Sequence, residues 1–400
     1  MSHLYDVAVI GAGPGGSAAA HYLAKSGLDV LLLDKSEFPR DKTCGDGLTP
    51  RALHVLDDMG ILDEVRSAGF QINGLELHAR AGNSLRAPIP KHPQYPDHLL
   101  IVPRFKLDDI IRRRAINSGA QFEAPIRVRS FETEADRVRI HTDAASQTFE
   151  ARVAILAIGA NMRLLQDLGI LRRQPEMIIA ARAYYEGMTG LSDHVEAHFA
   201  NVPLPGYGWV FPISSTAANV GVGYWPSSAP WRKLPASARQ VMDGFLRNPK
   251  ISSRLEGAER QGPIKSYPLR IDFATAPTHG ERILLVGETA GLVSPLTGEG
   301  IDFALECGKL AAEYLVEAFP RGEFGFASYD RLLRSHFQSI FRFLNYTRRL
   351  YLNPLLMGRM ITIAKRRPEV KRLLINVLMS QQHPSGLITP NVVRRVLLGA

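Results

Sequence analysis

A glycine-rich turn between a predicted strand and a predicted helix constrains this chain more than any other feature. The letters GAGPGG begin at Gly11 and form a G-x-G-x-x-G pattern, after the apolar residues 5–10 and before the helix-forming residues 18–25. In such a turn Gly11 redirects the chain, Gly13 lets the backbone approach a pyrophosphate, and Gly16 lets helix and strand pack closely. The pattern therefore predicts the first unit of a Rossmann-type dinucleotide-binding domain.

An acidic residue follows the second predicted strand at the spacing that such domains use. The strand covers 30–33, and Asp34 comes 18 residues after Gly16, where a carboxylate accepts hydrogen bonds from an adenosine ribose. The partial positive charge at the N-terminus of the first helix would face the phosphates. The cofactor-binding residues predicted in this unit are Gly11, Gly13, Pro14, Gly15, Gly16, Asp34 and Lys35.

A second glycine-rich region lies far along the chain, where GETAG follows one predicted strand and GEGI opens a helix. One fingerprint with a distant second turn suits a long cofactor that lies across both halves. That is the arrangement of FAD in the flavoprotein monooxygenase-like folds that this chain resembles. Because no second G-x-G-x-x-G pattern exists, either NAD(P)H binds transiently or another reductant donates the electrons. The cofactor-binding residues predicted here are Gly159, Glu288, Gly298, Gly300 and Ile301.

The middle of the chain has a different character, with alternating apolar residues and many aromatics, prolines and glycines, as antiparallel strands have. We therefore predict an α/β fold: a Rossmann-type FAD-binding domain with an inserted antiparallel β-sheet substrate domain and a helical C-terminal region. The predicted domains are a discontinuous FAD-binding domain (1–164 and 275–330, with part of the substrate sheet within 70–125), a substrate-binding sheet (165–274) and a basic helical region (331–400).

Charge is distributed unevenly along the chain. The net charge is +9, yet residues 331–400 contain 13 Lys or Arg and one acid, +12, which leaves −3 for the other 330 residues. Such asymmetry indicates an anionic surface as partner. Peripheral contact with an anionic membrane is favoured, and nucleic acid is the poorer alternative because the basic segment carries no nucleic-acid-binding motif.

Cysteine usage and hydropathy indicate the compartment. Cys44 and Cys307 form no disulfide framework, and no CxxC or HExxH pattern indicates a metal site. These features favour a reducing, cytoplasmic setting, with contact at the inner face of the membrane. No run of about 18 apolar residues predicts a membrane span, and the N-terminus lacks the features of a signal peptide. Cys307 lies on an apolar helical face, which is typical of a buried, inert thiol.

Four motifs together resemble one family. FPRDKTCGDGLTPRAL begins at Phe38, LPGYGWVFP at Leu204, NVGVG at Asn219 and GETAGLVSPLTGEGIDFALECGKLAA at Gly287. In this order they resemble the geranylgeranyl reductase family of flavoproteins, over roughly residues 5–320. The resemblance implies FAD as cofactor and reduction of the isoprenoid chain of a quinone, a pigment precursor or an ether lipid. It extends in particular to bacterial members that hydrogenate the prenyl tail of menaquinone.

The resemblance also implies roles for individual residues. The implied FAD contacts are Gly15, Asp34, Cys44, Gly45, Gly47, Arg104, Glu288, Gly300 and Ile301. The family's Y-x-W-x-F-P pattern corresponds to Tyr207, Trp209, Phe211 and Pro212, which would line the lipid pocket. Alternation along a strand puts residues 207, 209 and 211 on one face, and simple core packing is the alternative for these aromatics. In two departures, Glu288 stands where many members have Asp, and AIGANMR replaces a more polar run.

Reduction of an isolated alkene needs a hydride on one carbon and a proton on the other, inside a dry and apolar site. Cys44 is our candidate for an active-site role, either as donor or relay of that proton or as a residue that shapes the flavin pocket. Two other functions remain possible for this fold. One is an FAD-dependent monooxygenase or halogenase, although halogenases carry W-x-W-x-I-P where this chain has Tyr207 and Phe211. The other is a membrane subunit that only transfers electrons.

Overall fold

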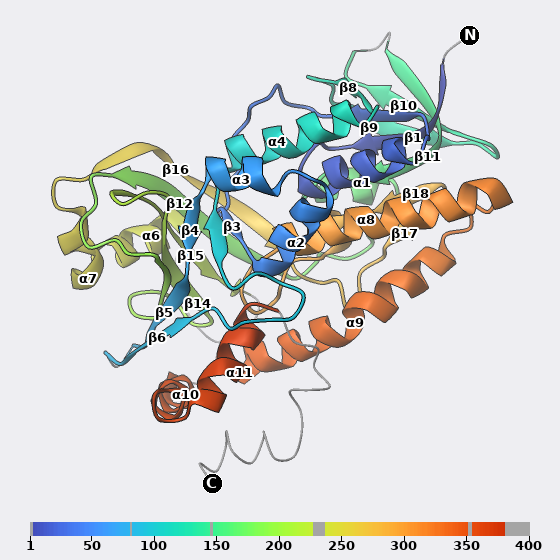
Figure 1. Cartoon of the computed structure of the whole chain (residues 1–400). Helices are drawn as coiled ribbons and strands as arrows, with labels where there is room; N and C mark the ends of the chain where they lie inside the picture. Colours follow the sequence, from blue (N-terminus) through green and yellow to red (C-terminus); the bar gives the residue numbers. More distant parts are fainter. Residues whose placement is uncertain (1–2, 81, 145–146, 227–236, 351–353, 381–400) are drawn as a thin grey trace.

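The computed structural model describes residues 3–80, 82–144, 147–226, 237–350 and 354–380, which form three sheets and the helices around them (Figure 1). The first sheet has the order β17-β18-β11-β1-β2-β8, and the hairpin of β9 and β10 pairs with β11. The central strands are parallel and apolar, as expected for strands that are covered on both faces. The strands are β1 (Leu4–Ile10), β2 (Val30–Leu33), β8 (Gln121–Glu123), β9 (Val128–Thr133), β10 (Val138–Thr142), β11 (Thr148–Leu156), β17 (His279–Gly280) and β18 (Ile283–Leu285).

The glycine-rich turn between β1 and helix α1 (Pro14–Lys25) packs as predicted. Gly11 has a φ of +105°, which favours glycine. A Cβ atom on Gly16 would lie 1.9 Å from the carbonyl oxygen of Gly11. On its other side, α1 meets helix α8 (Ile301–Ala318) closely, since a Cβ atom on Gly308 would lie 2.3 Å from the carbonyl oxygen of Gly15. Glycines thus bring β1, α1 and α8 into direct backbone contact.

The second sheet is antiparallel except for one parallel pair, β13 with β5, and has the order β16-β12-β15-β14-β13-β5-β6. The letters GWVFPISSTAANVGVGYW predict two strands joined by a Ser-Ser-Thr turn, and β14 and β15 form that hairpin. Helix α6 packs on this sheet so closely that a Cβ atom on Gly208 would lie 2.4 Å from the ring of Phe245. The strands are β5 (Gly74–His78), β6 (Ser84–Pro88), β12 (Met177–Glu186), β13 (His194–His198), β14 (Gly206–Pro212), β15 (Ala217–Tyr224) and β16 (Glu259–Arg270).

A small third sheet, in the order β3-β7-β4, lies beside the loop that follows β2. Its strands are β3 (Gly47–Leu48), β4 (Phe70–Ile72) and β7 (Leu99–Ile101). The remaining α-helices are α2 (Pro50–Asp58), α3 (Leu62–Ala68), α4 (Arg104–Asn117), α5 (Met162–Asp167), α6 (Ala238–Leu246), α7 (Pro249–Ser252), α9 (Ala327–Leu350), α10 (Pro354–Arg366) and α11 (Pro368–Leu378). Three short 3-10 turns complete the described chain: Ser253–Leu255, Gly287–Ala290 and Phe319–Arg321. The predicted fold class, a Rossmann-type domain with an inserted antiparallel sheet and a helical C-terminal region, is confirmed.

Two predicted elements have different bounds in the structure. The sequence pattern from residue 51 to about 67 predicts one helix, but the structure has two, α2 and α3, because Gly60 adopts a φ of +71° between them. The apolar letters ARVAILAIGA over 151–160 predict one buried strand, but β11 ends at Leu156, and the following residues bend past the glycine-rich turn. There the carbonyl oxygen of Ala157 lies 2.4 Å from the position that a Cβ atom of Gly11 would occupy.

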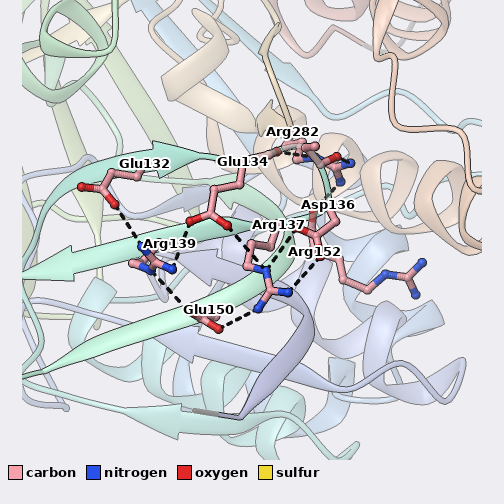
Figure 2. A network of polar contacts seen from close by, with 9 residues as sticks. Glu132, Glu134, Asp136, Arg137, Arg139, Glu150, Arg152 and Arg282 are labelled. Atoms are coloured by element: carbon pink, nitrogen blue, oxygen red, sulfur yellow. Dashed lines mark hydrogen bonds and ion pairs between the residues drawn. The ribbon is translucent and has the colours of Figure 1, made fainter. Parts of the chain in front are cut away.

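A surface network of ion pairs joins the β9–β10 hairpin to its neighbours (Figure 2). Glu150 of β11 pairs with Arg137 at 3.1 Å and with Arg139 at 3.2 Å. Arg282, just before β18, donates hydrogen bonds to the backbone carbonyls of Glu134 and Arg152. Individual exposed ion pairs add little stability, so the network mainly fixes the position of the hairpin against the edge of the sheet.

The helical C-terminal region packs on both halves of the molecule (Figure 1). In α9, Phe337 and Phe341 are buried against Phe273 and Phe303, with ring centroids 5.0–6.0 Å apart. Apolar residues of α10 and α11, such as Ile375, share a core with β5 and β6 of the second sheet. In the part of the chain that the structure describes, no helix combines the length and the apolar composition that crossing a membrane requires.

The backbone contact at Gly16 gives a direct test of the fold. We expect Gly16→Ala to lower the free energy of unfolding by about 3 kcal/mol, because the added methyl group cannot be accommodated without moving α1 away from β1. Gly325→Ala is the matched control, since Gly325 is exposed and a Cβ atom there would meet no atom within 4 Å. Chemical unfolding of both variants checks this, and equal stabilities would contradict it.

Candidate active site

A single cavity of about 950 Å³ runs between the first and second sheets. The predicted site residues that line it are Gly11, Gly13, Pro14, Gly15, Asp34, Lys35, Cys44, Gly45, Gly47, Arg104, Gly159, Tyr207, Trp209, Phe211, Glu288, Gly298, Gly300 and Ile301. Two predicted residues lie outside the lining. Gly16 lies at the contact between α1 and β1. Pro212 ends β14 and lies on the opposite face from Phe211, as strand alternation requires.

The end of the cavity beside α1 has the features of a dinucleotide phosphate site. Gly13 is the N-cap of α1 and Pro14 its first residue, so no capping side chain covers the first turn. Gly13, Pro14 and Gly15 line the cavity, so the N-terminus of α1 faces it, and a Cβ atom on Gly13 would lie 3.6 Å from the guanidinium group of Arg40. Asp34 is buried and accepts a hydrogen bond from the backbone N–H of Ala12 at 2.8 Å. Open N–H groups at a helix N-terminus fit a pyrophosphate.

An ion pair between Lys42, which the sequence did not single out, and the predicted residue Glu288 lines the cavity. The Nζ atom of Lys42 lies 3.0 Å from Oε2 of Glu288 and 4.8 Å from the centre of the Tyr267 ring. Burial works against the charge of Lys42, but the neighbouring Glu288 carboxylate raises the pKa of Lys42 above its usual value. Gly159 leaves room for this pair, because a Cβ atom there would lie 3.2 Å from Glu288. A cation is thus fixed between the two halves of the cavity.

The N-terminus of α8 also faces the cavity, since Gly300 and Ile301 line it. Gly300 is the N-cap of this 18-residue helix, and among the described residues no side chain caps it. The first turn of α8 therefore presents its partial positive charge to the cavity, where electron-rich groups are stabilised. Together with the α1 terminus and Lys42, these features fit a long anionic dinucleotide that spans both halves.

The turn formed by residues 44–47 is held against the second sheet by one buried side chain, Asn219. Its Nδ2 atom donates to the carbonyl oxygen of Cys44 at 2.7 Å and to Oδ2 of Asp46 at 2.8 Å. Tyr184 donates to the same oxygen of Asp46 at 2.6 Å. Gly45 lies so close to Phe211 that a Cβ atom would be 3.0 Å from the ring. The glycine at this position therefore permits direct contact between the turn and the sheet.

Asp46 has both an unusual backbone conformation and a buried carboxyl group. Its φ is +65°, in the left-handed region, and its side chain is fully buried. Burial raises the pKa of Asp46 to about 6, against the opposing effect of the hydrogen bonds from Tyr184 and Asn219. Oδ1 has no hydrogen-bond partner among the described residues. These settings place a carboxyl that titrates near neutral pH directly behind the cavity wall.

An aromatic wall forms the apolar half of the cavity, as the alternation along β14 predicted. The rings of Tyr207, Trp209 and Phe211 follow one another with centroids 6.0 Å apart. Their polar atoms are satisfied inside the protein: the Tyr207 hydroxyl donates to the carbonyl of Thr297, and the Trp209 indole donates to Oδ1 of Asn219 at 3.0 Å. The wall therefore offers apolar surface without an unpaired polar group.

Arg104 is buried at the start of α4 and not a surface cap. It forms a two-bond ion pair with Asp108, with both distances 2.7 Å, and it lines the cavity beside Cys44. Burial works against its charge, but Asp108 and then Cys44 raise the pKa of Arg104 above its usual value. Cys44 is half-buried in the lining. Cys307 is fully buried in α8, as predicted, and burial raises the pKa of its thiol to about 11.

The fold and the cavity define a dinucleotide-binding flavoprotein. The FAD binding domain family matches residues 4–323 of this chain. The chain is 35% identical over 321 residues to a menaquinone reductase of Mycobacterium tuberculosis, covering 78% of this chain and 76% of the relative. It is 30% identical over 345 residues to digeranylgeranylglycerophospholipid reductase 1 of Methanopyrus kandleri, covering 84% and 87%. The structure of a geranylgeranyl bacteriochlorophyll reductase-like protein of Thermoplasma acidophilum superposes with a TM-score of 0.82 at 21% identity, covering 96% and 98%.

These similarities cover most of the chain and agree with its own geometry. The protein belongs to the geranylgeranyl reductase family of FAD-dependent oxidoreductases. Its cofactor is FAD. The residues that would hold FAD are the open first turn of α1, Asp34, Lys42 with Glu288, and the first turn of α8.

Sequence reasoning did not single out four side chains of this site: Lys42, Asp46, Asn219 and Glu299. All four lie inside motifs that the resemblance had quoted, so their positions were visible as letters. Their partners were not, because Lys42 and Glu288 are 246 residues apart and Asp46 and Asn219 are 173 apart. A charged residue inside a glycine-rich loop is the only local signal that marks Lys42 and Asp46.

The raised pKa of Asp46 predicts a pH-dependent stability. The protonated carboxyl contributes to the free energy of unfolding. This contribution is fully present below about pH 4 and is lost as the pH rises through about 6. Asp46→Asn keeps an acceptor for Tyr184 and Asn219 and has no charge to bury. We expect the free energy of unfolding of this variant, relative to that of wild type, to rise by about 3 kcal/mol between about pH 4 and about pH 7. Urea unfolding at each pH measures this, with the exposed Asp57→Asn as control; parallel profiles for wild type and Asp46→Asn would refute it.

Proposed function

We propose that this oxidoreductase hydrogenates an isoprenoid double bond of a polyprenyl or geranylgeranyl lipid, such as the tail of a menaquinone. The observation that carries the proposal is the composition of the cavity. Its polar half has the helix termini and the Lys42 cation that suit FAD, and its apolar half is walled by Tyr207, Trp209 and Phe211. The names of the relatives, menaquinone reductase and digeranylgeranylglycerophospholipid reductase, support the same substrate class.

The apolar half of the cavity suits a long hydrocarbon chain. Beyond the aromatic wall, the lining continues through apolar residues of several elements, including Leu77, Val195, Leu269, Leu378 and Met379. The last two belong to the C-terminal helical region. A bound prenyl chain would therefore extend from the turn at residues 44–47 toward that region, and burial of its methylene groups would supply the binding free energy, about 0.8 kcal/mol for each.

The residues around the cavity can bind the alkene, orient it and keep water away from it. Reduced FAD supplies a hydride when it is bound in such a site. The aromatic wall holds the alkene, excludes water and offers no nucleophile. Hydrogen bonds from Tyr207 to Thr297 and from Trp209 to Asn219 fix the wall relative to the turns on either side. Cys44 lies in the lining beside this wall, where its thiol can relay a proton or shape the flavin pocket, and NAD(P)H or another reductant renews the electrons.

Exposed basic residues of the C-terminal helices suit contact with an anionic membrane. Arg359, Lys365, Arg366 and Arg372 are exposed on α10 and α11. Tyr346 of α9 is 63% exposed, which is unusual for a large apolar side chain. Leu378 and Met379 of the same C-terminal region line the cavity. We therefore propose that the protein rests peripherally on anionic lipid through α9–α11 and takes its substrate from there.

Anaerobic turnover separates the proposed reaction from its rivals. We expect the purified FAD-loaded protein, chemically reduced without oxygen, to convert a menaquinone in detergent micelles to a product whose prenyl tail has two added hydrogens, detected by mass spectrometry after any quinol has been reoxidised to the quinone. Monooxygenases and halogenases require oxygen, and an electron-transfer subunit would require a partner protein. A product that forms only with oxygen, or no product without a partner, would rule out the proposed function.

Vesicle binding tests the membrane contact. Replacing Arg359, Lys365 and Arg366 by Gln should weaken binding to vesicles that contain anionic phospholipid by about 100-fold, because each basic side chain near the surface contributes about 1 kcal/mol. Binding to neutral vesicles should not change. The control replaces Arg239, Arg247 and Lys250, which are equally exposed but lie on α6, α7 and their connection. Equal loss in both triple variants, measured by sedimentation, would argue against this surface.

A further inference from the structure

Glu299 lines the cavity but has no part in the mechanism described so far. It lies between Gly298 and Gly300, directly before the first turn of α8, and shares the cavity wall with Tyr207. The residue is partly accessible because it faces the cavity, while its carboxyl group lies deep inside the molecule. Its Oε2 atom is buried and has no hydrogen-bond partner among the described residues. The cavity thus contains a carboxyl with an unused oxygen.

A second buried acid accompanies it. Asp302, three residues along the chain, is 2% exposed, and its Oδ1 atom likewise has no partner in the described chain. Burial and the negative charge of Asp302 raise the pKa of Glu299 well above its ordinary value. Burial also raises the pKa of Asp302, although the charge of Arg51 opposes this shift. Two buried acids this close in the chain cannot readily both ionise, so the negative charge of one favours the protonated form of the other.

Arg51, whose charge acts on the pair, belongs to a set of polar contacts that extends to the surface of the molecule. The Thr49 hydroxyl donates to Oδ2 of Asp302 at 3.2 Å. Arg51 is ion-paired with Glu306, and Oε1 of Glu306 lies 2.7 Å from Nε2 of His336, whose side chain is 41% exposed. The charged and titratable groups around the pair are Arg51 of α2, Tyr95 of the loop before β7, Tyr207 of β14, Glu306 of α8 and His336 of α9.

We propose that Glu299 is the catalytic acid that protonates the substrate double bond, with Asp302 and Arg51 as its positioning residues. This inference rests on the proposed hydrogenation. The π bond of the alkene breaks, one carbon receives the hydride that reduced FAD supplies, and the other forms its C–H bond with the carboxyl proton of Glu299. Arg51 balances the carboxylate that remains, which regains a proton from solvent. A two-electron reductant, NAD(P)H or an equivalent donor, restores the hydride.

The surroundings of Glu299 suit this role better than those of Cys44. Glu299 lies beside an anion, Asp302, whereas Cys44 lies beside a cation, Arg104. Burial and the neighbouring anion both help Glu299 to hold its proton until the reaction occurs. Cys44 is then left to shape the turn that closes the cavity. The two assignments can be separated by experiment because Glu299 and Cys44 lie on different elements.

Two measurements on FAD-loaded Glu299→Gln test the proposal. The first is the anaerobic rate at which the reduced protein hydrogenates the prenyl tail of a menaquinone in micelles, followed across pH by mass spectrometry of the product after any quinol has been reoxidised to the quinone. We expect at least a 100-fold decrease, as for loss of a general acid, and disappearance of the decline in rate at high pH. The second needs no turnover: infrared spectra of the oxidised protein at neutral pH should show a protonated carboxyl that Glu299→Gln lacks.

Matched variants make these results specific. Glu313→Gln removes an exposed carboxylate from the same helix and should leave both readouts unchanged. Glu299→Asp should recover part of the rate with a shifted pH profile, which a purely structural role would not produce. Cys44→Ala should retain the infrared band of the protonated carboxyl.

The outcomes also distinguish the inference from the proposed function. If wild type hydrogenates the lipid and Glu299→Gln does so within threefold of its rate, or if the infrared band persists in that variant, Glu299 is not the acid. If wild type fails to hydrogenate the test lipid, the proposed reaction fails and the donor role falls with it. A slow Glu299→Gln variant that keeps its FAD and lacks the band supports both.

Discussion

The hydrogen bonds of Asn219 hold together the two halves of the site. One buried amide joins the indole of Trp209 in the aromatic wall to the Cys44 carbonyl and the Asp46 carboxyl in the turn. A buried amide left without these partners would lose its compensation for desolvation, so the wall and the turn are stable only together. The shape of the cavity follows from this arrangement, since the turn meets Phe211 where Gly45 has no side chain.

The cavity combines two environments that are normally kept apart. One half concentrates positive charge, from the termini of α1 and α8 and from the Lys42 cation, and fits the anionic cofactor. The other half is apolar, with its indole and phenol groups bonded away from the lumen. Hydrogenation of an unactivated alkene requires both, because the hydride source must be stabilised while the hydrocarbon stays dry. The acid pair at Glu299 lies where the two environments meet.

Much of the fold could be predicted because its determinants are local. The strand, glycine turn and helix at the N-terminus follow from a pattern within 30 residues, and the alternation along β14 predicted the aromatic wall. The break at Gly60 was missed because a positive φ is not visible in a helical pattern. The Lys42–Glu288 and Asp46–Asn219 contacts join distant segments, so only the tertiary fold reveals them. Glu299 and Asp302 are neighbours in sequence, but their burial, which gives them their chemistry, is set by α2, β14 and α9.

The central claim is that one cavity holds FAD and a prenyl chain in contact. A crystal structure of the protein with both bound would test it most directly, through the distance from the N5 atom of the flavin to the nearest double bond. We predict about 3–3.5 Å, the separation of groups poised to react, with the chain along Tyr207, Trp209 and Phe211 and the Glu299 carboxyl beside the same double bond. A prenyl chain bound outside this cavity, or a flavin that leaves the aromatic wall unoccupied, would contradict the account.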